Sequence, residues 1–102
     1  MVNKYLPQVP VLPEDDANRQ IANGFLLELD QAVSIRIQVL EETGGWGEVL
    51  RRFESDHVNV MDRYADRHMV LLIDFDGVPE RLATVKEGIP KRLIDRVLCS
   101  TH

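Results

Sequence analysis

The segment Met69–Ile73 constrains the fold of this 102-residue chain more than any other, because it is an unbroken apolar run, Met-Val-Leu-Leu-Ile. A run this short is typical of a strand rather than a helix, and a strand that is apolar on both faces needs cover on both. Such strands lie at the centre of parallel sheets in α/β proteins. We therefore expect Met69–Ile73 to be the central strand of a sheet that is covered by helices.

The rest of the chain alternates between strand-like and helix-like patterns. The other predicted strands are Val9–Leu12, Val33–Leu40 and Arg96–Ser100. The predicted helices are Ala17–Leu29, Trp46–Ala65 and one that begins at Pro79 and ends before Gly88. Alternating strands and helices favour right-handed crossovers. The prediction is a single α/β domain over residues 1–102, a three-layer Rossmann-like fold with a small, mostly parallel sheet of about four strands and helices on both faces.

Two of these predictions rest on periodicity alone. In Ala17–Leu29, apolar residues such as Ile21 and Phe25 recur at helical spacing, which predicts one buried stripe with Asn18 among the residues outside it. In Val33–Leu40, β-branched residues alternate with polar ones, which predicts a half-buried strand.

The charge balance limits the partners of the chain. Seventeen acidic residues against twelve basic ones give a net charge of −5, so strong autonomous binding of nucleic acid is not expected. Cys99 is the one cysteine, which excludes an intramolecular disulfide and fits a reducing compartment, so we expect a cytoplasmic protein. No apolar run approaches the roughly 20 residues of a membrane span, so no membrane partner is expected.

Two acidic clusters follow predicted strands. Glu14, Asp15 and Asp16 come after the first strand, and Asp74 and Asp76 come after the third. Ligands of open parallel sheets bind at the carboxyl ends of the strands, so adjacency of these two strands would bring the carboxylates together. Crowded carboxylates repel one another unless a cation neutralises them, and hard oxygen ligands suit Mg²⁺ or Mn²⁺.

For the second cluster, a structural turn is about as strongly indicated as a metal site. The sequence Asp74-Phe-Asp76-Gly77 is also ordinary turn chemistry, in which Asp bonds its own backbone and Gly takes positive φ. The acidic residues of the first cluster likewise suit the start of a helix, as caps and as charges that complement its dipole. Only the conjunction of the two clusters favours a metal site.

Three families share such an acidic arrangement. The stretch Leu72–Val78 resembles the first motif of haloacid dehalogenase-like phosphatases, and Val11–Asn18 resembles the first turn of response-regulator receiver domains. Both families require further motifs after the acidic strand end, and the segment after Asp76 is too short to hold them. Glu14 after the first strand and Asp74-Phe-Asp76 after the third, in a four-strand core of this size, resemble TOPRIM-like domains. More narrowly, Glu14–Phe25, Gly44–Trp46 and Arg67–Gly77, in a similarity that covers most of the chain, resemble a group of uncharacterised bacterial, notably cyanobacterial, proteins of this kind.

The TOPRIM resemblance implies a metal-dependent, nuclease-like phosphodiester-processing domain that acts on nucleic acid. It implies Glu14 as general acid/base and Asp74 and Asp76 as Mg²⁺ ligands. The further candidates at the site are Asp15, Asp16 and Gly77. The short carboxyl-terminal segment suggests a truncated copy whose fold persists without activity. The alternative is a non-catalytic interaction module, which pairs with a protein partner or with a second copy as a homodimer through an exposed sheet edge.

Other polar residues have structural interpretations first. His57 lies on the apolar stripe of its helix and is expected at the margin of the core, and Cys99 is expected to be a small buried strand residue. The Gly44–Gly47 loop is expected at the ligand edge of the sheet as a tight turn, and it is also a candidate phosphate contact. Secondary candidates for phosphate contacts are Arg51, Arg52, Lys86, Lys91, Arg92 and Arg96.

Overall fold

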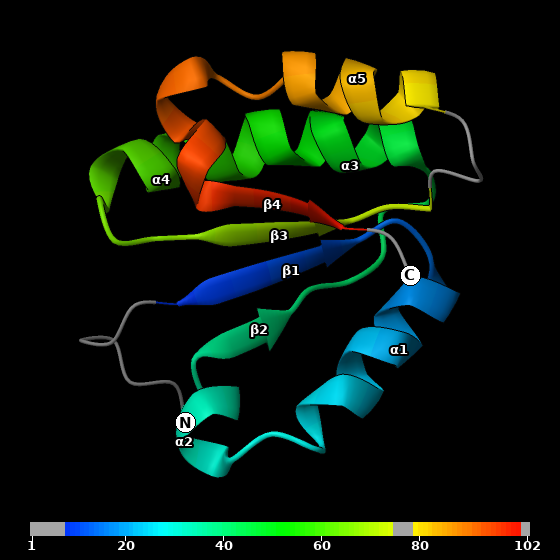
Figure 1. Cartoon of the computed structure of the whole chain (residues 1–102), viewed down its shortest axis with the longest axis vertical. Coiled ribbons are helices and arrows are strands. Elements are labelled where there is room, and N and C mark those ends of the chain that lie inside the picture. Colours follow the sequence, from blue (N-terminus) through cyan, green and yellow to red (C-terminus); the bar gives the residue numbers. More distant parts are fainter. Residues whose placement is uncertain (1–7, 75–78, 101–102) are drawn as a thin grey trace.

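The computed structural model describes residues 8–74 and 79–100, and its centre is a four-stranded sheet in the order β2-β1-β3-β4 (Figure 1). The strands are β1 (Val9–Pro13), β2 (Ile37–Val39), β3 (Met69–Leu72) and β4 (Val97–Ser100). All three strand pairs are parallel. The predicted α/β fold is therefore confirmed, with β1 and β3 as the two inner strands.

The helical elements connect the strands as crossovers. They are α1 (Asp16–Leu26), α2 (Gln31–Ser34), α3 (Trp46–Arg52), the π-helical turn η1 (Phe53–His57), α4 (Val58–Arg63), α5 (Pro79–Glu87) and the 3-10 turn η2 (Lys91–Arg96). The chain moves from β1 outward to β2, returns past β1 to β3 and then continues outward to β4. The direction of winding therefore reverses between β1 and β3, which is the position where open α/β sheets bind ligands.

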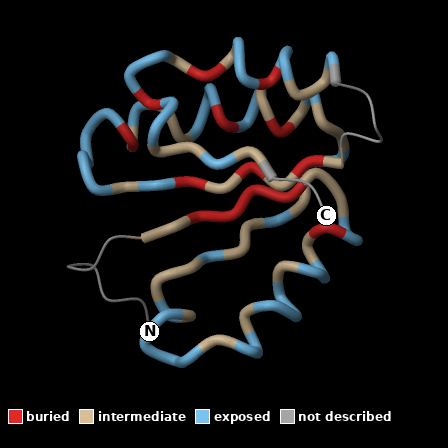
Figure 2. Tube along the Cα trace, in the orientation of Figure 1, coloured by how far each residue is buried: buried red, intermediate tan, exposed pale blue. Residues whose placement is uncertain are grey.

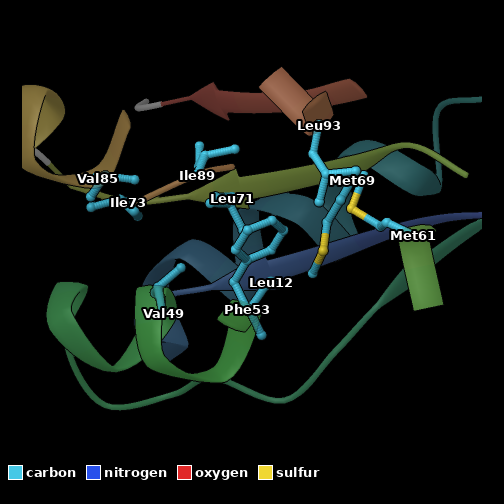
Figure 3. Close-up of a cluster of buried hydrophobic side chains, with 10 residues drawn as sticks. All are labelled: Leu12, Val49, Phe53, Met61, Met69, Leu71, Ile73, Val85, Ile89 and Leu93. Carbon is cyan, nitrogen blue, oxygen red and sulfur yellow. The ribbon is translucent and has the colours of Figure 1, made fainter. Parts of the chain in front are cut away.

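The main core lies on one face of the sheet, beneath α3, α4 and α5 (Figure 3). Its members are fully or almost fully buried and apolar: Leu12, Val49, Phe53, Met61, Met69, Leu71, Ile73, Val85, Ile89 and Leu93. Alternate residues of β3 supply this face because successive strand side chains point to opposite sides. None of the core residues comes from α1, which contacts β1 and β2 from the other side of the sheet (Figure 1).

The opposite face is only partly covered, and the predicted burial of α1 is wrong. Ile21 and Phe25 leave 47% and 61% of their surface exposed, whereas Asn18, expected outside the stripe, is fully buried. Figure 2 shows most of α1 in the colours of exposed and intermediate residues. The main contacts of α1 are with β1 and with β2, which has only three residues, so these strands cover only part of its apolar stripe. On the same face, Leu98 of β4 is 61% exposed.

Two predicted element boundaries also change. The predicted strand Val33–Leu40 is wrong at its start, because α2 forms there and β2 begins only at Ile37. The amides of Val33 and Ser34 both donate to the Asp30 carbonyl, so a local turn uses the donors that a longer strand would need. The predicted helix from Trp46 runs to Arg63 through α3, η1 and α4, with the π-helical turn in its middle.

One arginine joins the carboxyl end of α4 to η2. The Arg96 Nη1 atom donates to the carbonyls of Met61, Tyr64, Ala65 and Arg67 at 3.0 to 3.2 Å. The last carbonyls of a helix have no partner inside it, and a cation there also complements the helix dipole. Arg96 is therefore a carboxyl-terminal cap that is supplied from another element.

Candidate functional site

The structure brings the two acidic strand ends together at the reversal point between β1 and β3. The Glu14 amide donates to the Leu72 carbonyl at 2.9 Å and so extends the pairing of β1 with β3. The Asp74 amide in turn donates to Glu14 Oε1 at 3.3 Å, across 60 residues of sequence. The adjacency of the two strands, which was the condition for bringing the acidic clusters together, is therefore present in the structure.

The carboxyl group of Glu14 has an altered proton affinity. Partial burial raises the pKa of Glu14, and the negative charges of Asp15 and Asp74 add to the rise. The Asp74 amide and the positive charge of Arg81 oppose it. A carboxyl group whose pKa moves toward neutrality is better suited to proton transfer than an ordinary surface glutamate.

The loop after β2 holds the backbone of Glu14 in place. The Gly44 amide donates to the Glu14 carbonyl at 2.9 Å, and the Thr43 amide donates to the Pro13 carbonyl at 3.1 Å. Gly44 has φ of +99°, a conformation that other residues rarely adopt. The predicted position of the glycine loop at the ligand edge is confirmed, and the loop supports the end of β1.

Arg81 completes the site from the first turn of α5. Its Nη1 atom donates to the Asp74 carbonyl at 3.3 Å, and its guanidinium carbon lies 5.9 Å from the centre of the Trp46 ring. Arg81 and Trp46 are both half-buried. Sequence reasoning did not select Arg81, although its place in the first turn after the Asp74 strand end was a usable indication, since that turn begins at the ligand edge.

The remaining predicted residues differ in what the structure says of them. Asp15 is the N-cap of α1, where its carboxylate accepts the Asn18 amide at 2.8 Å, and Asp16 is the exposed first residue of that helix. These positions match the capping interpretation, although Asp15 still acts on Glu14 through its charge. Asp76 and Gly77 lie outside the described residues.

Few of the described side chains at this site are available as metal ligands. Among residues 8–74 and 79–100, no group of three or more His, Cys, Asp or Glu side chains is placed to hold a metal ion. Glu14 and Asp74 are nevertheless carboxylates on adjacent strand ends, and Mg²⁺ commonly binds one or two carboxylates, together with waters and substrate phosphates. The Asp74 carboxylate has the chemistry that a hydrated Mg²⁺ or Mn²⁺ requires, with the Glu14 carboxylate beside it. The other predicted ligand, Asp76, lies outside the described residues.

Several other candidates have structural contacts elsewhere. Arg92 forms a bidentate pair with Asp62 at 2.8 Å, and Arg96 caps α4, so both are structural contacts at the amino-terminal edge of the sheet. His57 is half-buried and burial lowers its pKa, as expected at a core margin. Cys99 packs against the core, and burial raises the pKa of its thiol.

Comparison with known proteins adds no relative. No family model, no curated protein and no solved structure matches the chain. In the described part of the chain, no helix is both long enough and apolar enough to cross a membrane.

Proposed function

We propose that the chain is a TOPRIM-type, divalent-cation-dependent domain that cleaves or transfers phosphodiesters at the reversal point of the sheet. The observation that carries the proposal is the hydrogen bond from the Asp74 amide to Glu14 Oε1, which joins two acidic strand ends that lie 60 residues apart. Fold analogy gives only a class of reaction, so the residues of the site must carry the argument.

Each residue has a defined part in this proposal. Asp74 and Asp76 hold Mg²⁺ or Mn²⁺, which when bound supplies Lewis-acid polarisation of a phosphoryl oxygen. Glu14 accepts the proton of the attacking hydroxyl group or donates one to the leaving oxygen. Its raised pKa supports this assignment, and the Asp74 amide restricts rotation of its carboxylate.

The nucleic-acid substrate is held weakly by this chain alone. A net charge of −5 repels a polyanion at long range, so affinity must come from contacts at the site and from the cation. This favours assays on short single-stranded substrates, which carry few phosphates, at a salt concentration of about 0.1 M or above, where screening weakens the long-range repulsion.

The test is an amide NMR titration with Mg²⁺ and Mn²⁺ of the wild-type chain and the variants Glu14→Gln and Asp74→Asn. We expect saturable Mg²⁺ shifts and Mn²⁺ broadening at residues 14–16 and 72–74, both lost in Asp74→Asn. Asp95→Asn is the matched control, because Asp95 is an exposed aspartate in η2, before β4. A folded wild-type protein that shows no saturable shifts, or whose shifts persist in Asp74→Asn, would refute the metal site.

A second candidate function is a non-catalytic interaction module. β4 is an edge strand that pairs with β3 alone, and its Leu98 side chain is 61% exposed beside the partly covered face of the sheet. An unprotected edge with an apolar side chain favours pairing with another chain. Light scattering of wild type and Leu98→Lys tests this function, which predicts a dimer that the substitution dissociates; a monomer at every concentration contradicts the homodimer.

A further inference from the structure

We propose that Arg81, supported by the Trp46 ring, is a subsite for one phosphate group beside Glu14. The inference rests on the proposed function and deepens it, because it names the residue that would recognise the phosphate of the substrate. The juxtaposition that carries it is a half-buried arginine held between an indole ring and the end of β3.

The contacts of Arg81 orient its guanidinium group. The donor bond to the Asp74 carbonyl fixes one end of the group at 3.3 Å, and the indole ring lies 5.9 Å from its central carbon. A guanidinium is planar, stacks on aromatic rings and presents its donors as a fork that matches phosphate oxygens. Support on one face and at one end reduces the freedom that a long side chain loses when it binds a ligand.

The charges at this edge explain why the subsite takes a single phosphate. Arg81 donates to the Asp74 carbonyl and the Asp74 amide donates to Glu14, so the guanidinium and the Glu14 carboxylate lie at the same strand end. Around them lie the carboxylates of Glu14, Asp15 and Asp74, which repel a continuous polyanion. One localised cation among carboxylates suits the phosphate of a nucleotide or of a strand end better than the backbone of a long duplex.

Three other arginines are held by contacts of their own and do not extend this subsite. Arg19 pairs with Glu42 at 3.0 Å, and Arg92 pairs with Asp62 on the far edge of the sheet. Arg96 is the cap of α4. These three arginines therefore form no basic track that leads to Arg81.

The chain contains its own optical probe of the subsite. Trp46 is the only tryptophan of the chain, and Arg81 lies over its ring, so a ligand that binds the guanidinium changes the fluorescence of this residue. The experiment is a titration of Trp46 fluorescence with inorganic phosphate and with a mononucleotide, in buffer without divalent cations and again with Mg²⁺, with chloride at matched ionic strength as the screening control. Calorimetry repeats each titration, because a variant at Arg81 changes the starting fluorescence.

We expect saturable binding of phosphate to wild type, loss of binding in Arg81→Gln and affinity weaker by about tenfold in Arg81→Lys, which keeps the charge without the fork. Arg63→Gln is the matched control: it removes the same charge from an exposed side chain at the end of α4, which is not a candidate phosphate contact. Glu14→Gln should strengthen binding several-fold without divalent cations, because one repelling charge is removed. Tighter binding of the mononucleotide than of inorganic phosphate would identify the nucleotide as the source of the phosphate.

The outcome that overturns the subsite is a wild-type titration without saturation, or equal affinity in wild type and Arg81→Gln, with folding of each protein checked by circular dichroism. Failure of the subsite is distinguishable from failure of the proposed function. Phosphate binding that needs Arg81, without Mg²⁺ shifts at residues 14 and 74, refutes the metal site and keeps the subsite. Mg²⁺ shifts at residues 14 and 74 without phosphate binding refute the subsite and keep the metal site.

Discussion

Replacement of Arg96 by methionine tests how much one capping side chain contributes to stability. Arg96 Nη1 lies within 3.0 to 3.2 Å of four carbonyl oxygens at the end of α4 and in the turn that follows it. Methionine keeps an unbranched apolar stem and removes the donors and the charge. The carbonyls then lose their partner, and α4 loses the cation at its carboxyl end.

The expected loss of stability depends on the number of hydrogens that Nη1 can donate rather than on the number of carbonyl oxygens around it. Nη1 carries two hydrogens, so its interaction with the four carbonyls is equivalent to about two hydrogen bonds. A bond to a charged donor contributes about 1.5 kcal/mol at the low end of its range, which applies here because two of the four bonds are exposed. We expect Arg96→Met to lower the free energy of unfolding by about 2 to 3 kcal/mol.

Urea unfolding followed by far-UV circular dichroism measures this loss, and Arg92→Met is the matched control. Arg92 lies in the same turn, loses the same charge and forms a bidentate pair with Asp62, but both side chains are substantially exposed. Exposed ion pairs contribute little, so the loss in Arg92→Met should be clearly smaller at an unchanged denaturant slope. If Arg96→Met lowered the free energy of unfolding by no more than Arg92→Met does, the carbonyl contacts of Arg96 would stabilise the fold no more than an exposed ion pair, and the reasoning would be refuted.

Two further predictions use the same unfolding assay. Gly24→Ala should stabilise the chain by about 1 kcal/mol, because an added Cβ in α1 meets no atom within 4 Å. Gly88→Ala should destabilise the chain by about 1 kcal/mol, because its Cβ would lie 2.7 Å from both Leu50 methyl carbons. Equal effects of the two substitutions would contradict the packing of α3 against α5. Because the pKa of Glu14 is raised in the folded state, its stabilising contribution is complete below its ordinary pKa and is lost as pH rises through the folded pKa. Glu14→Gln should therefore gain stability relative to wild type as the pH rises above the ordinary pKa of glutamate, and a stability difference that is constant with pH would remove the physical basis for the raised pKa of Glu14.

Much of the fold follows from local patterns in the sequence. The apolar run at Met69 predicted the inner strand, and Pro79 and Gly88 delimited α5 because each residue has a backbone preference of its own. The meeting of Glu14 with Asp74 followed from one assumption about strand order, which β1 and β3 satisfy. These features depend on short-range chemistry or on general rules of α/β topology.

The features that escaped prediction depend on what packs against them. Ile21 recurs at helical spacing but stays half-exposed, because its spacing does not reveal how little of the sheet α1 covers. Asn18 is polar and yet fully buried, which no periodicity in its own helix indicates. Arg81 follows Asp74 by only seven residues, but its contact with the Trp46 ring joins segments far apart in the chain, which no local pattern indicates.

The site is assembled from every crossover of the fold, and this affects how it responds to ligands. Glu14 follows β1, Trp46 begins the crossover to β3, and Asp74 and Arg81 belong to the crossover to β4. Local opening of any one crossover separates these groups, so a ligand that contacts them together binds only the fully closed chain. Such a ligand would stabilise all three crossovers together. Amide hydrogen exchange should then slow in all three at once rather than only in the segments that the ligand contacts.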